Sequence, residues 1–384
     1  MTHPWLLPEY VEDILPPYAW QAESLRRQLL DRYDSYGYEL VCPPLIEYLD
    51  SLLTGAAGDL DLKTFKVVDG LSGRMMGVRA DMTPQAARID AHLLNRQSPT
   101  RLCYAGPVLH TRPSGLMTSR EPYQVGAELF GHPGIEADRE ILELLLASLA
   151  IADLTNVRVS LGHVGLFRAL AAAAGLDGAV GQPLFRALRA KDMPLLIELT
   201  ETMSEPWRGA FLRLSELYGG PEVIEQARRA LPDLPGVTQA LDDLAGLLSV
   251  NGMADLGVDL ADLRGYGYHT GAVFAAYVGG QASAVALGGR YDGAGAVFGR
   301  SRPGTGFSLD LRRILASLPE PAGRAGILAP PDSSAELKAR MAELRGAGER
   351  VVVEFGGGPA SPPAETGCNR RLAWLAGAWQ VVPL

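Results

Sequence analysis

Cysteine is scarce in this chain, and its positions do not suit a disulfide framework or a zinc site. The 3 cysteines, Cys42, Cys103 and Cys368, lie far apart in the sequence, and no Cys-x-x-Cys occurs. The 6 histidines form no pair at the spacing of metal ligands. We therefore expect free thiols and no metal site, in the reducing environment of the cytoplasm.

Long apolar segments are also absent. No run of about 18 apolar residues occurs, so no membrane span is expected. The first residues, MTHPWLLPEYVEDILPP, contain no basic segment followed by an apolar one. This beginning does not predict a signal peptide.

Basic charge is in deficit. Lys and Arg number 35 against 44 Asp and Glu, which gives a formal net charge of −9. Nucleic-acid-binding proteins usually carry a basic surface, so the composition argues against tRNA binding, although it leaves room for a local basic patch. With 384 residues, 47% of them hydrophobic, the chain is long enough for two or three folded domains.

The most informative stretch, Leu102 to Gly131, predicts two strands joined by a long loop. On the second strand Gln124, Gly126 and Glu128 share one face, because side chains alternate along a strand. An amide and a carboxylate are unusual on a face that packs in an apolar core. Residue spacing alone leaves open a ligand-binding face or an exposed face with Arg–Glu pairs. The loop carries side chains that suit an anionic ligand: Arg112, Ser114, Thr118, Ser119 and Arg120.

The segment before this stretch predicts a helix, a short strand and a hairpin. Helix 18–36 has Leu25, Leu29 and Tyr33 on one face. A strand at 38–42 should follow. The next expected elements are strands 64–68 and 75–79.

The following turn predicts a helix start. Thr83 is expected as the N-cap, with Pro84 at the first helical position. Asp81 and Thr83 could simply serve this helix start and bind no ligand.

The rest of the chain alternates strands and helices around a helix-rich region. Residues 163–250 have few strand signals and frequent prolines, which is typical of a helical insertion. The other expected elements are a helix from 137 to 151, strands 157–161 and 256–260, and in the tail a strand at 325–329, a helix at 334–346, a strand at 351–354 and an apolar run at 372–383.

A second informative stretch combines arginine with aromatic residues. Arg264, Tyr266, Tyr268 and His269 lie within six residues. One interpretation is an aromatic-rich turn with a packing role. The other is a hydrogen-bonding set for a free amino acid, in which arginine pairs with the carboxylate and polar rings bind the side chain.

These motifs, taken in order, resemble the class II aminoacyl-tRNA synthetases and specifically the histidyl-tRNA synthetases. The strand from Gln124 to Glu128 resembles the histidine-binding strand of motif 2. Asp81 and Thr83 resemble the glutamate and threonine that hold the α-amino group, and Arg264 resembles the arginine that faces the carboxylate. Two further runs, Gly288 to Gly293 and Gly304 to Arg313, resemble a glycine-rich family motif and motif 3.

The resemblance implies an α+β fold like the class II synthetase catalytic core, with an antiparallel sheet flanked by helices. This domain would cover residues 1–320, with the helical insertion at about 163–250. Residues 321–384 would form a short C-terminal α/β segment instead of a full anticodon-binding domain. The helix and strand near the N-terminus resemble motif 1, which implies a homodimer.

The nucleotide half of the motifs departs from the synthetase pattern. In an ungapped alignment, His110 and Arg112 replace the arginine and the glutamate that begin motif 2. A one-residue gap would align Arg112 with that arginine, but the glutamate would still be missing. In motif 3 the family's glycine and glutamate are Asp310 and Arg312, whereas Arg313 is retained. A carboxylate beside a polyphosphate would repel it. This pattern resembles the regulatory subunits of ATP phosphoribosyltransferase, synthetase relatives that act in histidine biosynthesis.

That resemblance implies a regulatory protein with no catalytic residues of its own, no cofactor and no tRNA. It would assemble with the short-form catalytic subunit and bind free histidine as the feedback inhibitor. The implied histidine-binding residues are Asp81, Thr83, Gln124, Glu128, Arg264, Tyr268 and His269. Possible anion contacts are Arg112, Arg120, Arg290 and Arg313.

The alternative is an enzyme, a divergent histidyl-tRNA synthetase or another amino-acid-activating protein. Arg264, Arg290 and Arg313 favour it. His110, Asp310, the short tail and the negative charge oppose it. A catalytic phosphoribosyltransferase fits less well, because the chain has no acidic pair followed by a small-residue phosphate loop.

Overall fold

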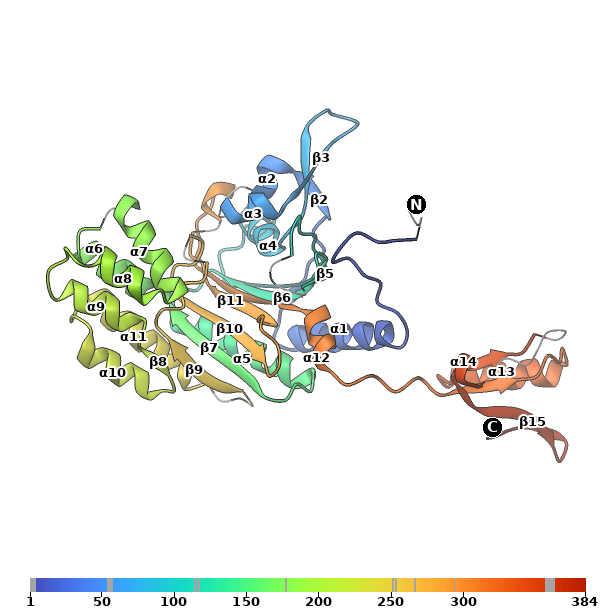
Figure 1. Cartoon of the computed structure of the whole chain (residues 1–384). Helices are drawn as coiled ribbons and strands as arrows, with labels where there is room; N and C mark the ends of the chain where they lie inside the picture. The colour runs from blue at the N-terminus through green and yellow to red at the C-terminus, as the bar shows by residue number, and fades with distance from the viewer. Residues whose placement is uncertain are drawn as a thin grey trace. The chain divides into compact units, whose positions relative to one another are not determined.

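The computed structural model describes residues 5–53, 58–113, 115, 118–176, 178–250, 252, 254–265, 267–293, 295–355 and 363–384. The chain divides into two compact units, one of residues 1–13 and 22–319 and one of residues 14–21 and 320–384 (Figure 1). No helix among the described residues is long and apolar enough to cross a membrane. None of their His, Cys, Asp and Glu side chains form a group that could hold a metal ion.

A mostly antiparallel sheet forms the centre of the first unit. In the part of the chain that the structure describes, nine strands follow the order β1-β5-β6-β12-β11-β10-β7-β9-β8. Only the β1–β5 and β7–β9 pairs in this described sheet are parallel. The strands are β1 (Glu39–Leu40), β5 (Thr100–Pro107), β6 (Tyr123–Phe130), β7 (Val157–His163), β8 (Tyr218–Gly219), β9 (Asp255–Asp259), β10 (Ala272–Val278), β11 (Ala286–Arg290) and β12 (Gly304–Asp310).

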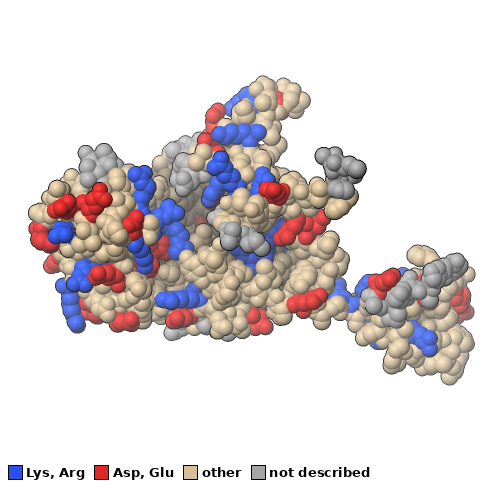
Figure 2. Space-filling view, viewed as in Figure 1, with Lys and Arg blue, Asp and Glu red and all other residues tan. Residues whose placement is uncertain are grey.

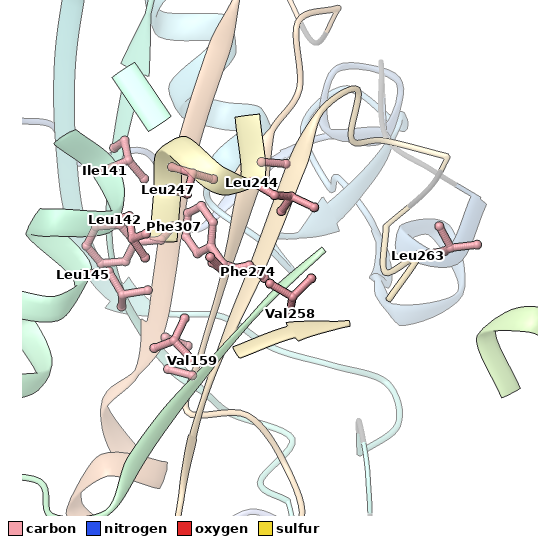
Figure 3. Close-up of a cluster of buried hydrophobic side chains, with 14 of the residues drawn as sticks. Ile141, Leu142, Leu145, Val159, Leu244, Leu247, Val258, Leu263, Phe274 and Phe307 are labelled. Atoms are coloured by element: carbon pink, nitrogen blue, oxygen red, sulfur yellow. The ribbon is translucent and has the colours of Figure 1, made fainter. Parts of the chain in front are cut away.

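Helices cover one face of this sheet and form its apolar core. They are α1 (Tyr18–Ser35), α5 (Ile135–Ile151), α11 (Pro235–Leu248) and α12 (Leu311–Ser317). Leu25, Leu29 and Tyr33 of α1 are buried, as the spacing of four predicted. Figure 3 shows Leu142 of α5 beside Phe307 of the sheet. The opposite face is therefore the one on which polar side chains of the strands can meet a ligand.

The helix-rich region is an insertion between β7 and β9. It contains α6 (Val164–Ala173), α7 (Gly178–Ala190), α8 (Met193–Leu199), α9 (Trp207–Leu214), β8, α10 (Glu222–Ala230) and α11. Buried side chains of these helices, such as Phe167 and Phe211, belong to the same apolar cluster as the sheet. The predicted helical character of residues 163–250 is confirmed.

The opposite face of the sheet carries shorter elements. They are α4 (Thr83–Arg88), the π-helix η1 (Ile89–Leu94), the 3-10 helix η2 (Ala296–Phe298) and a small sheet with α2 and α3. The small sheet has the order β2-β4-β3 in the described residues, and its predicted strands 64–68 and 75–79 are β3 and β4. Met82, Ala86, Leu102 and Tyr104 form part of a separate buried cluster beneath α4. The small sheet and its two helices consist of α2 (Leu49–Leu53), α3 (Gly58–Lys63), β2 (Ile46–Tyr48), β3 (Phe65–Val68) and β4 (Met75–Val78).

The second unit is a small α/β arrangement with a core of its own. Its described strands follow the order β14-β13-β15-β16. The apolar run at 372–383 contributes to two paired strands, and Ala376 and Gly377 at the turn between them have positive φ values. The elements are β13 (Gly326–Ala329), α13 (Ala335–Gly346), β14 (Val351–Val353), α14 (Pro363–Thr366), β15 (Cys368–Leu375) and β16 (Ala378–Pro383).

Candidate functional site

Strand β6 divides its side chains between the core and the opposite face of the sheet. Val125, Ala127 and Leu129 belong to the apolar cluster under α1 and α5. Gln124 and Glu128 therefore point to the other face, as the alternation predicted. The candidate site is built on this face, where α4 and the loops after β9 and β11 meet β6.

Glu128 accepts hydrogen bonds from three hydroxyl groups. Its Oε1 accepts from Thr83 Oγ1 at 2.8 Å and from the Tyr104 hydroxyl at 2.9 Å. Its Oε2 accepts from the Tyr291 hydroxyl. We call Thr83, Tyr104, Glu128 and Tyr291 the Glu128 cluster. These contacts bring together three elements far apart in the sequence, namely the start of α4, the β5–β6 pair and the end of β11.

Burial sets the charge state of this carboxyl group. Glu128 is only 1% exposed. Loss of hydration raises its pKa to about 8, although hydrogen bonds from Tyr291, Thr83 and Tyr104 act in the opposite direction. Glu128 is therefore mostly protonated near neutral pH, and a ligand that brings a basic group can share its proton.

The room for this cluster comes from glycine at position 126. Gly126 pairs with Tyr104 across the β5–β6 ladder. A Cβ atom at residue 126 would lie 2.6 Å from the Tyr104 hydroxyl oxygen. Glycine at this position thus allows the Tyr104 side chain to reach Glu128.

A second network joins Gln124 to the start of α4. Gln124 Oε1 accepts a hydrogen bond from the Met82 amide at 3.0 Å, and its Nε2 donates to Asp81 Oδ1 at 3.2 Å. Asp81 Oδ1 also accepts from the Thr83 amide at 3.1 Å. Asp81, Thr83, Gln124 and Glu128, predicted to act together, are therefore adjacent in the structure.

The predicted N-cap role of Thr83 is wrong. The N-cap of α4 is Met82, which makes no side-chain cap hydrogen bond. The Thr83 hydroxyl donates to Glu128 instead. Asp81 does serve the helix start, since it accepts from the Thr83 amide. The Thr83 hydroxyl thus contributes to the candidate site and does not cap the helix.

Tyr268 and His269 lie next to the Glu128 cluster. The Tyr268 ring stacks on Tyr291 with centroids 5.0 Å apart, and it meets the His269 ring edge to face at 5.4 Å. The Tyr268 hydroxyl is buried and has no hydrogen-bond partner among the described residues. Burial lowers the pKa of His269 to about 4, so its imidazole is neutral at physiological pH. Tyr268 is therefore a buried polar group that a ligand can satisfy.

We expect Tyr268→Phe to raise the free energy of unfolding, measured without added histidine, by about 1 kcal/mol. The change removes a buried hydroxyl that has no partner here, and such a group costs free energy in the folded state. Tyr291→Phe is the matched control, because it removes a hydroxyl that does bind Glu128 and should destabilise by about 1–2 kcal/mol. Urea unfolding of both variants measures the difference, and destabilisation by Tyr268→Phe would contradict the expectation.

Arg264 lies on the same side of the sheet but outside the Glu128 cluster. Its Nε donates to Asp262 Oδ1 at 2.9 Å, and its Nη2 donates to the other oxygen of the same carboxylate. The guanidinium carbon is 5.6 Å from the centre of the Tyr277 ring. The expected partner of a ligand carboxylate is thus paired with a carboxylate of its own loop.

The predicted anion contacts of the β5–β6 loop differ in their surroundings. Arg112 is exposed. Arg120 donates through Nε to the His110 carbonyl at 3.1 Å, and its guanidinium lies 5.2 Å from the centre of the Phe65 ring. Ser114, also predicted to contact an anion, lies outside the described residues. Of the loop's two arginines, Arg112 is the one placed to meet solvent anions.

Arg290 and Arg313, the other predicted anion contacts, make internal contacts. Arg290 is buried and donates to Asp138 Oδ2 from both Nε (2.9 Å) and Nη2 (2.6 Å), and it also pairs with Asp292 at 3.0 Å. Arg313 pairs with Asp310 at 3.1 Å. These carboxylates neutralise both guanidinium groups within the fold.

The motif 2 substitution His110 is also part of the fold. His110 is buried, its Nε2 lies 2.9 Å from the Ala80 carbonyl oxygen, and burial lowers its pKa. Arg312, which replaces a glutamate in motif 3, pairs with Glu121 at 3.0 Å. Both residues that differ from the synthetase pattern therefore make contacts within the fold, His110 with the Ala80 carbonyl and Arg312 with Glu121.

Sequence reasoning missed three residues of this region. Tyr104 and Tyr291 bind Glu128, and Asp262 binds Arg264. The first could have been found from its position opposite Gly126, and the second from its place in the Gly-Gly-Arg-Tyr-Asp-Gly run. No sequence signal distinguished Asp262 from other loop carboxylates.

The surface around these elements is richer in basic side chains than the net charge suggests. Figure 2 shows Lys and Arg atoms gathered between the helical insertion and the arm that carries β3. Acidic groups on this face lie on the insertion, along the lower edge of the unit and at mid-height on its right side in this view. The overall negative charge thus coexists with a local basic surface near the site.

Comparisons with known families agree with the motif order. Residues 10–314 match the histidyl-tRNA synthetase family model, and residues 324–382 match the model for the C-terminal domain of the ATP phosphoribosyltransferase subunit HisZ. The chain is 54% identical over 379 residues to the ATP phosphoribosyltransferase regulatory subunit of Burkholderia thailandensis, and the match covers 99% of both chains. The corresponding protein of Burkholderia pseudomallei is equally similar, at 54% over 379 residues and 99% of both chains.

Solved structures show the same fold. A Bacillus halodurans protein described as an ATP phosphoribosyltransferase regulatory subunit/histidyl-tRNA synthetase superposes with a TM-score of 0.86 at 26% identity, covering 97% of this chain and 98% of the other. Histidyl-tRNA synthetase from Nostoc superposes with a TM-score of 0.79 at 17% identity, covering 100% and 97%. The expected class II synthetase-like fold is confirmed.

Proposed function

The chain belongs to the family of ATP phosphoribosyltransferase regulatory subunits, and from this premise we propose that it senses free histidine. In this proposal it has no catalytic residues and acts in the cytoplasm on a short-form catalytic subunit. That partner needs it for activity, and histidine acts through it as the feedback inhibitor. A homodimer through α1 and β1, without tRNA, completes the proposed assembly.

The observation that carries the histidine proposal is the Glu128 cluster with its neighbours. Glu128 offers a carboxyl oxygen to an imidazole ring, and Tyr268 offers a hydroxyl that has no partner among the described residues. Asp81 and Thr83 lie beside them, where an α-ammonium group would find a carboxylate and a hydroxyl. Together they match the amine and ring of histidine.

The nucleotide side supports a sensor over an amino-acid-activating enzyme. A synthetase needs free cationic groups to hold the polyphosphate of ATP. Arg313, retained from motif 3, is paired with Asp310, and Arg312 is paired with Glu121. His110 stands in the place of the motif 2 arginine and is neutral at physiological pH because burial lowers its pKa. Nucleotide binding would require these internal pairs to break.

The test is reconstitution of the full chain with a short-form catalytic subunit. We expect phosphoribosyl transfer to rise on mixing and to fall again on addition of histidine. The chain alone should give no histidine-dependent ATP–pyrophosphate exchange above the rate without protein. Histidine-dependent ATP–pyrophosphate exchange by the purified chain would identify it as an amino-acid-activating enzyme. Phosphoribosyl transfer by the complex that histidine does not inhibit would contradict the sensor role.

A further inference from the structure

The ion pair between Arg264 and Asp262 occupies the group that a histidine carboxylate would need. Asp262 is 9% exposed, and its two oxygens accept from Nε and Nη2 of Arg264 in a bidentate arrangement. Asp262 Oδ1 also accepts from the Arg264 amide at 3.3 Å. A planar guanidinium presents its Nε–Nη2 edge to one carboxylate at a time. This edge of Arg264 is occupied by Asp262.

The strand register places this ion pair on the site face, away from Glu128. Glu128 pairs with Gly306, Gly306 with Gly289 and Gly289 with Val273, and directly opposed residues share a face. Tyr277, beneath the Arg264 guanidinium, is four residues beyond Val273 and on the same face. Strand β10 is three strands from β6, which is about 14 Å at the usual strand spacing. An amino acid bound at Glu128 is too short to span this separation, so Arg264 would have to move towards Glu128 to bind its carboxylate.

The segment between Arg264 and Tyr268 connects this pair to the Glu128 cluster. The amides of Tyr268 and His269 both donate to the Gly265 carbonyl at 2.7 Å, which forms a tight turn. Arg168 of α6 donates to the His269 carbonyl at 2.8 Å. Arg264 thus begins the same turn whose Tyr268 ring stacks on Tyr291. Arg264 and Tyr268 therefore belong to one short segment.

We propose that Asp262 is an internal carboxylate that competes with the carboxylate of the bound effector for Arg264. The inference rests on the proposed histidine-sensing function and adds a positioning residue to it. In this structure Asp262 holds Arg264 over Tyr277. In the bound protein the effector carboxylate takes the place of Asp262, so the affinity for histidine is lower than it would be with a free Arg264.

The test compares histidine with histidinol, which has the same ring and amine but no carboxylate. Asp262→Asn keeps an oxygen that can accept from the Arg264 amide and removes the charge. We expect this variant to bind histidine about fivefold more tightly, about 1 kcal/mol, and to bind histidinol as the wild type does. Calorimetric titration of the full chain, alone and with its catalytic subunit, measures both ligands. Glu216→Gln, which breaks the exposed pair of Arg213 and Glu216, is the control.

The outcomes separate competition from a structural role. Equal weakening of both ligands by Asp262→Asn, or unchanged histidine binding, would overturn the proposal. In an Arg264→Gln background the Asp262→Asn change should have no effect on histidine, and a persisting effect would also overturn it. Asp262→Ser, which is small and polar, repeats the test if the asparagine variant fails to fold. If wild-type protein binds no histidine even in the complex, the proposed function itself fails.

Discussion

Replacing Glu128 with alanine is expected to abolish the response to histidine, with a loss in affinity of a hundredfold or more. The change removes the acceptor for the ligand ring and leaves the hydroxyls of Thr83, Tyr104 and Tyr291 without their shared carboxyl group. Removal of one buried partner from such a hydrogen-bonded group costs about 2–5 kcal/mol of binding free energy. This is the largest effect that a single site residue should produce.

Inhibition of the reconstituted complex as a function of histidine concentration measures this prediction. Glu140→Ala is the matched control, because Glu140 also accepts from a tyrosine hydroxyl (Tyr38, 2.9 Å) and pairs with Arg101 at 2.6 Å, but lies on α5 at the other face. The control should lose stability and keep inhibition. Full inhibition in Glu128→Ala would remove Glu128 from the binding site.

Periodicity and breakers predicted many individual helices and strands, whereas the class II synthetase-like fold was predicted from the resemblance of the ordered motifs. The spacing of Leu25, Leu29 and Tyr33 indicated both the helix and its buried face, since a helix returns to the same side every three to four residues. Strand ends were less predictable. The strand expected at 38–42 is assigned only at Glu39–Leu40. Pairing partners, which determine where a strand stops, are set by contacts distant in the sequence.

The candidate site was predictable where its residues lie close together in the chain. Gln124 and Glu128 were placed on one face by alternation alone. Tyr104 and Tyr291 reach Glu128 from 24 and 163 residues away, so the alternation along the strand of Glu128 does not indicate them. The ion pair of Arg264 with Asp262 was equally hidden, because sequence shows which charges exist but not which of them meet.

The repulsion expected from Asp310 in the nucleotide half has a structural counterpart. Burial raises the pKa of Asp310, whereas the pairing with Arg313 and backbone amides of the α12 start lower it. The substitution therefore adds a carboxylate and also engages the retained arginine. A single exchange of glycine for aspartate changes two groups at once, which a residue-by-residue reading of the motif does not reveal.

The affinity for histidine is also expected to depend on pH, with a maximum between about pH 6.5 and pH 8. Burial raises the pKa of Glu128 to about 8, so its carboxyl group carries one proton below that pH. Free imidazole has a pKa near 6.5. The neighbouring tyrosines 104, 268 and 291 stay neutral, because burial raises the pKa of each well above its usual value. The buried carboxyl–imidazole pair should keep one proton when the complex forms, since a net charge there would lack hydration.

The sign of the pH effect follows from counting protons. Below about pH 6.5 the free Glu128 carboxyl and the free imidazole each carry a proton, and the bound carboxyl–imidazole pair keeps only one. Binding therefore releases a proton, and affinity rises with pH. Between the two pKa values the number of bound protons does not change on binding. Above pH 8 the free carboxylate and the neutral ring bring none, so binding takes up a proton and affinity falls, by roughly tenfold between pH 7.5 and pH 9. Titration in buffers of different ionisation enthalpy measures this uptake directly. In the Glu128→Gln variant residue 128 does not titrate, so the pH dependence of its histidine affinity reflects the ligand alone. If the wild-type affinity instead rises through pH 8, the bound pair holds no proton and Glu128 binds as a carboxylate against a neutral ring.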